Sequence, residues 1–159
     1  MYYQAKASVR IVSANLQINQ PGFNRKMDQS NVYPTGPVFT RKVLIVDDQP
    51  EVRLLMRVAL RKNYELIEAA NGVDALQEID RHHPKLIMLD IMMPGEMDGL
   101  QVLDVIKADQ KFKHIVVCMI TARGQTADGI EAIKRGADGY FIKPFSPREV
   151  FDWVDSKLR

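Results

Sequence analysis

The chain has 159 residues, of which 46% are hydrophobic and 26% are charged, the balance of a globular protein that folds in water. This length accommodates one domain and a modest extension, and no apolar run approaches the roughly 20 residues that cross a bilayer. A single cysteine, Cys118, excludes an internal disulfide and a cysteine-based metal cluster. Because the first residues lack the apolar core of a secretory signal, we expect a cytoplasmic protein.

The net charge of +2 is unevenly distributed along the chain. Residues 1–42 carry six basic side chains and one acidic side chain, so the remainder has a net charge of −3. A slightly acidic globular part gives no electrostatic case for binding nucleic acid. We interpret the basic residues of the N-terminal part as solvated charge on an arm.

Residues 1–40 are rich in Asn, Gln, Ser, Pro and Gly, a composition that favours a loosely ordered segment. We therefore predict an N-terminal extension over 1–40 that is flexible or docks on a partner. Residues 9–18 have enough apolar side chains for a short strand or for a partner contact, and both readings stay open. A globular domain is predicted over 41–159, where apolar runs alternate with amphipathic stretches.

The first part of this domain contains three predicted strands and two predicted helices. Residues 43–46 form a short apolar run that ends in acids, as in a buried parallel strand. Residues 50–62 predict a helix, because proline suits its first position and apolar residues recur on one face. A strand over 65–69, a helix from Gly72 and a strand over 85–90 follow.

The second part continues the alternation. We predict a helix over 99–108, a strand over 115–120, and a helix over 125–135 that is followed by a glycine suited to cap its C-terminus. Residues 140–142 form a short fifth strand. A last helix follows, with a serine as N-cap, a proline at its first position and a glutamate that completes a capping box.

Five strands that alternate with helices predict an α/β fold, a doubly wound parallel sheet with helices on both faces. In such sheets, ligands bind beyond the carboxyl ends of the strands, where the strand order reverses. Four strands of the predicted sheet end at, or are followed by, polar residues whose side chains can bind ligands or take part in a reaction. They are Asp47, Asp48, Asp90, Thr121 and Lys143.

Each of these residues has an ordinary structural explanation when it is taken alone. Asp48 and Thr121 could serve helix starts, Asp90 could form a turn, and Lys143 could be exposed in a loop. Their joint occurrence at four strand ends is not explained in this way. Converging carboxylates would repel one another, and a divalent cation such as Mg²⁺ would offset the repulsion.

The same set of residues predicts a reaction. A carboxylate oxygen would attack phosphorus and form an aspartyl phosphate, a reaction that requires mainly positioning and charge stabilisation from the protein. The Lys143 ammonium would neutralise phosphoryl oxygens, and the Thr121 hydroxyl would donate a hydrogen bond to one of them.

Six runs of the sequence, covering about residues 42–158, together resemble the receiver domains of bacterial response regulators. They are VLIVDD at 43–48, LDIMMP at 89–94, MDG at 97–99, TA at 121–122, GADGY at 136–140 and KPF at 143–145. No single run is specific, but the set in this order is. The resemblance implies a flavodoxin-like sheet with five strands in the order 2-1-3-4-5.

The resemblance also implies a role for each matching residue. Asp90 is the expected phosphorylation site, and Asp47, Asp48, Asp90 and the backbone carbonyl of Met92 are the expected Mg²⁺ ligands. Lys143 is expected to contact the phosphoryl group. Such a domain is a signalling receiver that assists its own phosphorylation and dephosphorylation, and is not an enzyme with a separate substrate.

A switch is implied as well. Thr121 is expected to move toward the phosphoryl group and Tyr140 to turn inward, while Lys143 is joined to Pro144 by a cis bond. These movements would remodel the surface of the fourth helix, fifth strand and fifth helix. The expected partners are a sensor histidine kinase or histidine phosphotransfer protein, a downstream protein, and a second copy in a phosphorylation-dependent homodimer. No direct contact with nucleic acid or membrane is expected.

One loop differs in length from the family pattern, and two positions that vary in the family carry large side chains here. Gly95 and Glu96 occupy a loop that is usually one residue shorter, which puts partner contacts there in doubt. Met92 and Arg123 lie two residues after Asp90 and Thr121, at positions that tune the lifetime of the phosphoryl group in the family. Because both side chains could shield it from water, we expect slow self-dephosphorylation.

Three readings of the function stay open. The sequence ends after the last predicted helix, which favours a stand-alone receiver. An alternative is the receiver part of a larger response regulator or hybrid kinase. A Mg²⁺-dependent phosphohydrolase with an aspartyl nucleophile is a third reading, but the acids after the first strand lack its usual spacing. A receiver unable to take phosphate would lack an acid or the lysine, and all are present.

Overall fold

The computed structural model describes residues 41–122 and 125–159. The predicted N-terminal extension over 1–40, with its apolar segment over 9–18, lies outside these described residues, as does Arg123. The boundary between extension and domain therefore stays a prediction.

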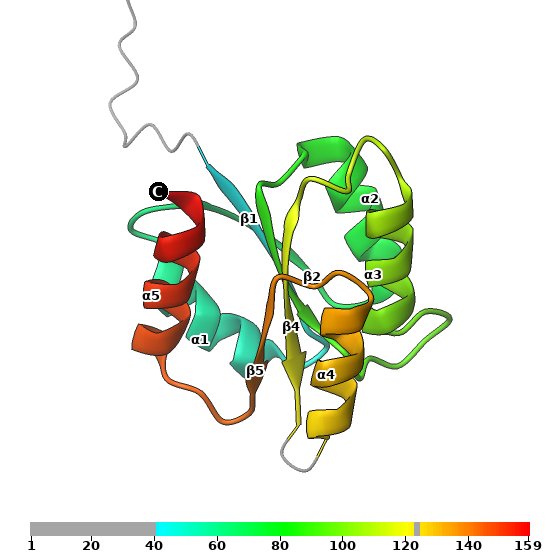
Figure 1. Cartoon of the computed structure of the whole chain (residues 1–159). Coiled ribbons are helices and arrows are strands. Elements are labelled where there is room, and N and C mark those ends of the chain that lie inside the picture. The colour runs from blue at the N-terminus through cyan, green and yellow to red at the C-terminus, as the bar shows by residue number, and fades with distance from the viewer. Residues whose placement is uncertain (1–40, 123–124) are drawn as a thin grey trace, which may run out of the picture. The chain divides into compact units, whose positions relative to one another are not determined.

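Strands and helices alternate through the described part of the chain, as the hydrophobic pattern predicts (Figure 1). The strands are β1 (Lys42–Val46), β2 (Glu65–Ala69), β3 (Leu86–Asp90), β4 (Val116–Thr121) and β5 (Gly139–Ile142). The helices are α1 (Pro50–Leu60), α2 (Gly72–His82), α3 (Gly99–Ala108), α4 (Thr126–Lys134) and α5 (Pro147–Leu158). Every predicted element is confirmed, with ends that differ by one or two residues.

The five strands form one parallel sheet in the order β2-β1-β3-β4-β5, which confirms the implied topology. Helices α1 and α5 cover one face, and α2, α3 and α4 cover the other (Figure 1). Because β1 lies between β2 and β3, the strand order reverses beside it. The carboxyl ends of β1 and β3 therefore flank the position where such sheets bind ligands.

The central strands β1, β3 and β4 are themselves almost entirely buried. Leu44 and Ile87 face one apolar cluster and Ile45 and Met88 face the other, and all four are fully buried. Alternation along each strand sends successive side chains to opposite faces, which is why continuous apolar runs form these strands. Each such side chain contributes roughly 1.5–3 kcal/mol on burial. The sheet is thus a rigid support for the residues at its carboxyl edge.

Several helix ends follow from local sequence. The predicted capping box of α5 is present between Ser146 and Glu149, and α3 has a second one between Asp98 and Gln101. Gly136 follows α4 with a φ of 100°, a left-handed conformation that favours glycine. These signals mark where α3 and α5 begin and where α4 ends.

Two glycines allow close packing between the helices and the sheet, and the first of them lies next to the carboxyl edge. A Cβ atom at Gly99, the first residue of α3, would lie 2.0 Å from the backbone oxygen of Asp90. A Cβ atom at Gly139 in β5 would lie 2.8 Å from the ring of Trp153 on α5. Each position therefore requires glycine for space.

Candidate functional site

The five polar residues predicted to converge are placed at one edge of the sheet. Asp47 and Asp48 follow β1, Asp90 ends β3, Thr121 ends β4, and Lys143 follows β5. Asp47 and Thr121 are fully buried, and only 3% of Asp90 is exposed. Buried charged groups are costly unless they are paired, so their neighbours matter.

Lys143 is the basic partner of this site. Its Nζ atom lies 2.9 Å from Asp47 Oδ2 and 3.2 Å from Asp90 Oδ1, and the side chain is 19% exposed. The reading of Lys143 as an exposed loop lysine is therefore wrong. The peptide bond to Pro144 is cis, as the resemblance implied. Burial lowers the pKa of Lys143, but contacts with Asp47 and Asp90 outweigh it and raise the pKa overall.

The three carboxylates also form a site that fits a divalent cation. Asp47, Asp48 and Asp90 each offer an oxygen, and these oxygens lie within 4.8 Å of one another. Within the described part of the chain, the buried Oδ1 atom of Asp48 has no hydrogen-bond partner. Asp48 is not the cap of α1, because Gln49 occupies that position. A buried oxygen that accepts no hydrogen bond calls for another partner. Together with the two other carboxylates it forms a set of oxygen ligands that hard cations prefer.

The surroundings of Asp90 disfavour the charged form of its carboxyl group. Burial, followed by the nearby charge of Asp47, raises its pKa from 3.8 to about 6, although Lys143 opposes the change. A carboxylate with so high a pKa is destabilised as an anion in the metal-free protein. Added positive charge at this edge would relieve that state.

We predict that the metal-free protein loses stability as the pH rises from about 4 to about 6. The folded state holds a proton on Asp90 in this range while the unfolded state releases it, so deprotonation favours unfolding by up to about 3 kcal/mol. Urea denaturation in EDTA at several pH values measures the effect. The Asp90→Asn protein is the control, and an equal slope in both proteins would contradict the assignment to Asp90.

The two predicted switch residues contact the region of α4 in this structure. The Thr121 hydroxyl donates to the carbonyl oxygen of Gln125 at 3.1 Å. Tyr140 is half-buried, and its ring lies against Gly129 of α4, where a Cβ atom would approach to 2.7 Å. A phosphoryl group would have to draw the Thr121 hydroxyl away from Gln125, so the switch stays a prediction.

The residues expected to tune the phosphoryl lifetime are only partly described. The Met92 side chain is 58% exposed, and Arg123 lies outside the described residues. The role of the Met92 carbonyl as a cation ligand stays a prediction. The longer loop contains Gly95, whose φ of 118° explains why glycine is suited to that position.

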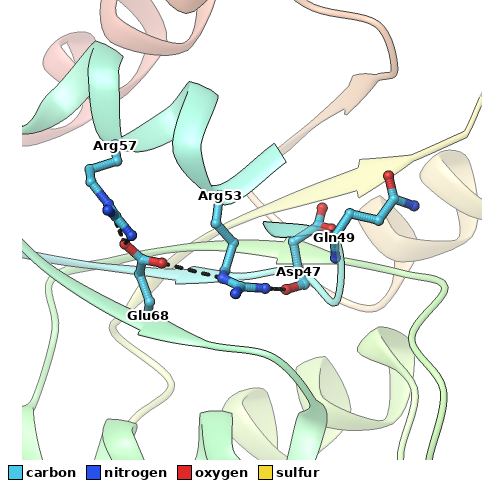
Figure 2. Close-up of polar contacts among 5 residues, drawn as sticks. All are labelled: Asp47, Gln49, Arg53, Arg57 and Glu68. Carbon is cyan, nitrogen blue, oxygen red and sulfur yellow. Dashed lines mark hydrogen bonds and ion pairs between the residues drawn. The ribbon is translucent and has the colours of Figure 1, made fainter. Parts of the chain in front are cut away.

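One contact of the site was not foreseen from the sequence. Arg53 of α1 donates a 2.7 Å hydrogen bond to the backbone oxygen of Asp47 (Figure 2). The local signals were an acid, Glu68, next to apolar residues within its strand, and arginines one helical turn apart at positions 53 and 57.

A family model for the response regulator receiver domain matches residues 43–155. The chain belongs to this family. Receiver domains are signalling domains of two-component systems, so the reading of the sequence is confirmed at that level. Within the described ranges, none of the helices has the length and apolar character needed to span a bilayer.

Known relatives agree with this assignment. The transcriptional regulatory protein SrrA of Staphylococcus aureus is 39% identical over 121 residues, which cover 76% of this chain and 48% of SrrA. The chain thus spans about half the length of the curated relatives it matches.

Solved structures of similar fold are also receivers. A putative response regulator from Chloroflexus aurantiacus is 33% identical with a TM-score of 0.70, covering 74% of this chain and 97% of that one. The receiver domain of NtrX from Brucella abortus is 32% identical with a TM-score of 0.68, covering 73% and 97%. Chemotaxis response regulator CheY4 of Vibrio cholerae is 28% identical with a TM-score of 0.68, covering 74% and 98%.

Proposed function

We propose that this receiver accepts a phosphoryl group on Asp90 from a histidine kinase or a histidine phosphotransfer protein. The observation that carries the proposal is the position of Lys143, whose ammonium lies within 3.2 Å of Asp90 in a site with two further acids. A carboxylate oxygen of Asp90 forms the new bond to phosphorus, and the bond between phosphorus and the donor breaks. Lys143 orients Asp90 and pairs with a phosphoryl oxygen.

Mg²⁺ is the proposed cofactor, held by Asp47, Asp48 and Asp90, with the Met92 carbonyl as a further ligand. It is a hard cation that prefers carboxylate oxygen and commonly joins carboxylates to a phosphoryl oxygen. When bound, it supplies positive charge that offsets the negative charge of the phosphoryl group. The protein's own contribution is to hold three acids and one ammonium at fixed positions on the sheet.

The proposed output is a change of the surface formed by α4, β5 and α5. Thr121 would leave the Gln125 carbonyl for a phosphoryl oxygen, and Tyr140 would follow inward. SrrA is named a transcriptional regulatory protein and is about twice as long as the matched region. The same switch could therefore serve a separate partner, a second copy, or an attached output segment. We propose action in the cytoplasm, where kinases of this kind phosphorylate their receivers.

The test uses acetyl phosphate as a small donor, with intact-mass spectrometry as the readout. We expect one phosphoryl group per chain in the presence of Mg²⁺ and none in EDTA, with release by hydroxylamine, which cleaves acyl phosphates. The group should persist after the donor is removed, because Met92 and Arg123 are expected to shield it. Continuous release of inorganic phosphate without a retained group would instead show a phosphohydrolase.

A further inference from the structure

Arg53 joins three segments of the structure at the carboxyl end of β1. Its Nη1 atom donates to the backbone oxygen of Asp47 at 2.7 Å, and its Nε atom donates to Glu68 Oε2 of β2 at 3.2 Å (Figure 2). Its own backbone N–H bonds to the oxygen of Gln49 in the first turn of α1. The guanidinium therefore lies between the start of a helix and the ends of two strands.

The contact with Asp47 restricts both of the first two acids. The peptide group between Asp47 and Asp48 is planar, so a bond to the Asp47 oxygen fixes the plane that carries the Cα atom of Asp48. Two further bonds hold Asp47: its N–H donates to Ala69 at 3.2 Å, and its Oδ1 accepts from Gln49 at 2.9 Å. Together with these bonds, the contact from Arg53 restricts the directions in which the carboxylates of Asp47 and Asp48 can point.

Glu68 in turn holds Arg53 in place. Its carboxylate accepts from Arg53 and, through the other oxygen, from Arg57 at 2.7 Å (Figure 2). The Glu68 side chain is 24% exposed and that of Arg53 is 20% exposed, so neither is freely solvated. A charge-assisted bond of this kind orients the planar guanidinium at little further cost in entropy.

We propose that Arg53 is a positioning residue for the divalent-cation site, oriented by Glu68 and acting through the backbone of Asp47. The proposal rests on the proposed function, because it assumes that Asp47 and Asp48 bind the cation. Arg57 provides a matched control. It has the same charge and also pairs with Glu68, but within the described part of the chain its side chain makes no hydrogen bond with Asp47.

Electrostatics alone predicts the opposite sign for this effect. Removing a positive charge near a cation site reduces repulsion and should strengthen cation binding. Weaker binding after loss of Arg53 would therefore reflect lost positioning and not lost charge. The sign of the change in cation affinity therefore distinguishes positioning by Arg53 from a general effect of the charges of Arg53, Arg57 and Glu68.

The experiment is a Mg²⁺ titration by calorimetry of the wild type, Arg53→Gln, Arg57→Gln and Glu68→Gln. We expect Arg53→Gln to weaken Mg²⁺ binding about tenfold or more, which is typical when a group that orients a metal ligand is lost. Arg57→Gln should bind as the wild type or slightly more tightly. Glu68→Gln should weaken binding, but less than Arg53→Gln, and it serves as the test if Arg53→Gln does not fold.

A second readout is the rate of phosphorylation by acetyl phosphate as a function of Mg²⁺ concentration. Arg53→Gln should need more Mg²⁺ for half the maximal rate and should approach the wild-type rate at saturation. Unchanged Mg²⁺ affinity in Arg53→Gln and Glu68→Gln, or equal weakening in Arg57→Gln, would overturn the proposal. If the wild type itself does not bind Mg²⁺, the proposed function fails instead.

Discussion

Asp90→Asn should leave the protein unable to retain a phosphoryl group while making the metal-free protein more stable. The amide has no nucleophilic carboxylate oxygen, so no acyl phosphate can form at this position. The same change removes a buried anion that is repelled by Asp47 and whose pKa is raised to about 6. At neutral pH the gain in stability is expected to reach up to about 3 kcal/mol, because the unfavourable charge is absent.

Intact-mass spectrometry with acetyl phosphate measures the first effect, and urea denaturation in EDTA measures the second. Asp80→Asn is a suitable control, because the Asp80 side chain is 67% exposed and lies in α2, away from the site. It should take up one phosphoryl group and unfold like the wild type. A retained hydroxylamine-sensitive group in Asp90→Asn would disprove Asp90 as the acceptor.

Gly99→Ala should destabilise the fold by about 3 kcal/mol or more, the upper end of what overpacking costs. The added methyl group would lie 2.0 Å from the Asp90 oxygen and 2.9 Å from the Cα atom of Ile91. Both are backbone atoms, so a change of rotamer cannot relieve the clash. The start of α3 would have to move away from β3, breaking the 2.9 Å hydrogen bond from Gly99 to Ile91.

Gly95→Ala is the matched control for this substitution. No atom lies within 4 Å of the Cβ position at Gly95, but its φ of 118° disfavours any side chain. We expect a loss of about 1–2 kcal/mol from backbone strain alone. Urea denaturation of both variants gives the comparison. Equal losses would mean that the close approach of Gly99 to β3 does not limit this position.

The strand ends explain why most of the site was predictable. In a parallel sheet, the residue after each buried apolar run reaches the same edge, so Asp47, Asp90 and Lys143 could be brought together from their positions alone. The pattern of apolar and polar residues in the sequence also predicted every strand and helix of the described part of the chain. Element ends were less certain: the first helix was predicted to reach Lys62, but α1 ends at Leu60.

Contacts across elements could not be read from the sequence. Positions 53 and 57 are one helical turn apart, but this spacing does not reveal that Glu68 of β2 lies opposite both arginines or that Arg53 reaches Asp47. The direction of the Thr121 hydroxyl depends on the loop before α4, whose backbone carbonyl at Gln125 accepts from it. Such contacts depend on how the sheet and helices pack, which local propensity does not encode.

Because Gly139 leaves space for the indole of Trp153, we expect these two positions to change together among related proteins. A larger residue in the strand would collide with the ring, and a smaller residue on the helix would leave a void. Relatives that carry a side chain at the first position should therefore carry a less bulky residue at the second. Exchanges at the two sites would be tolerated as a pair and selected against singly.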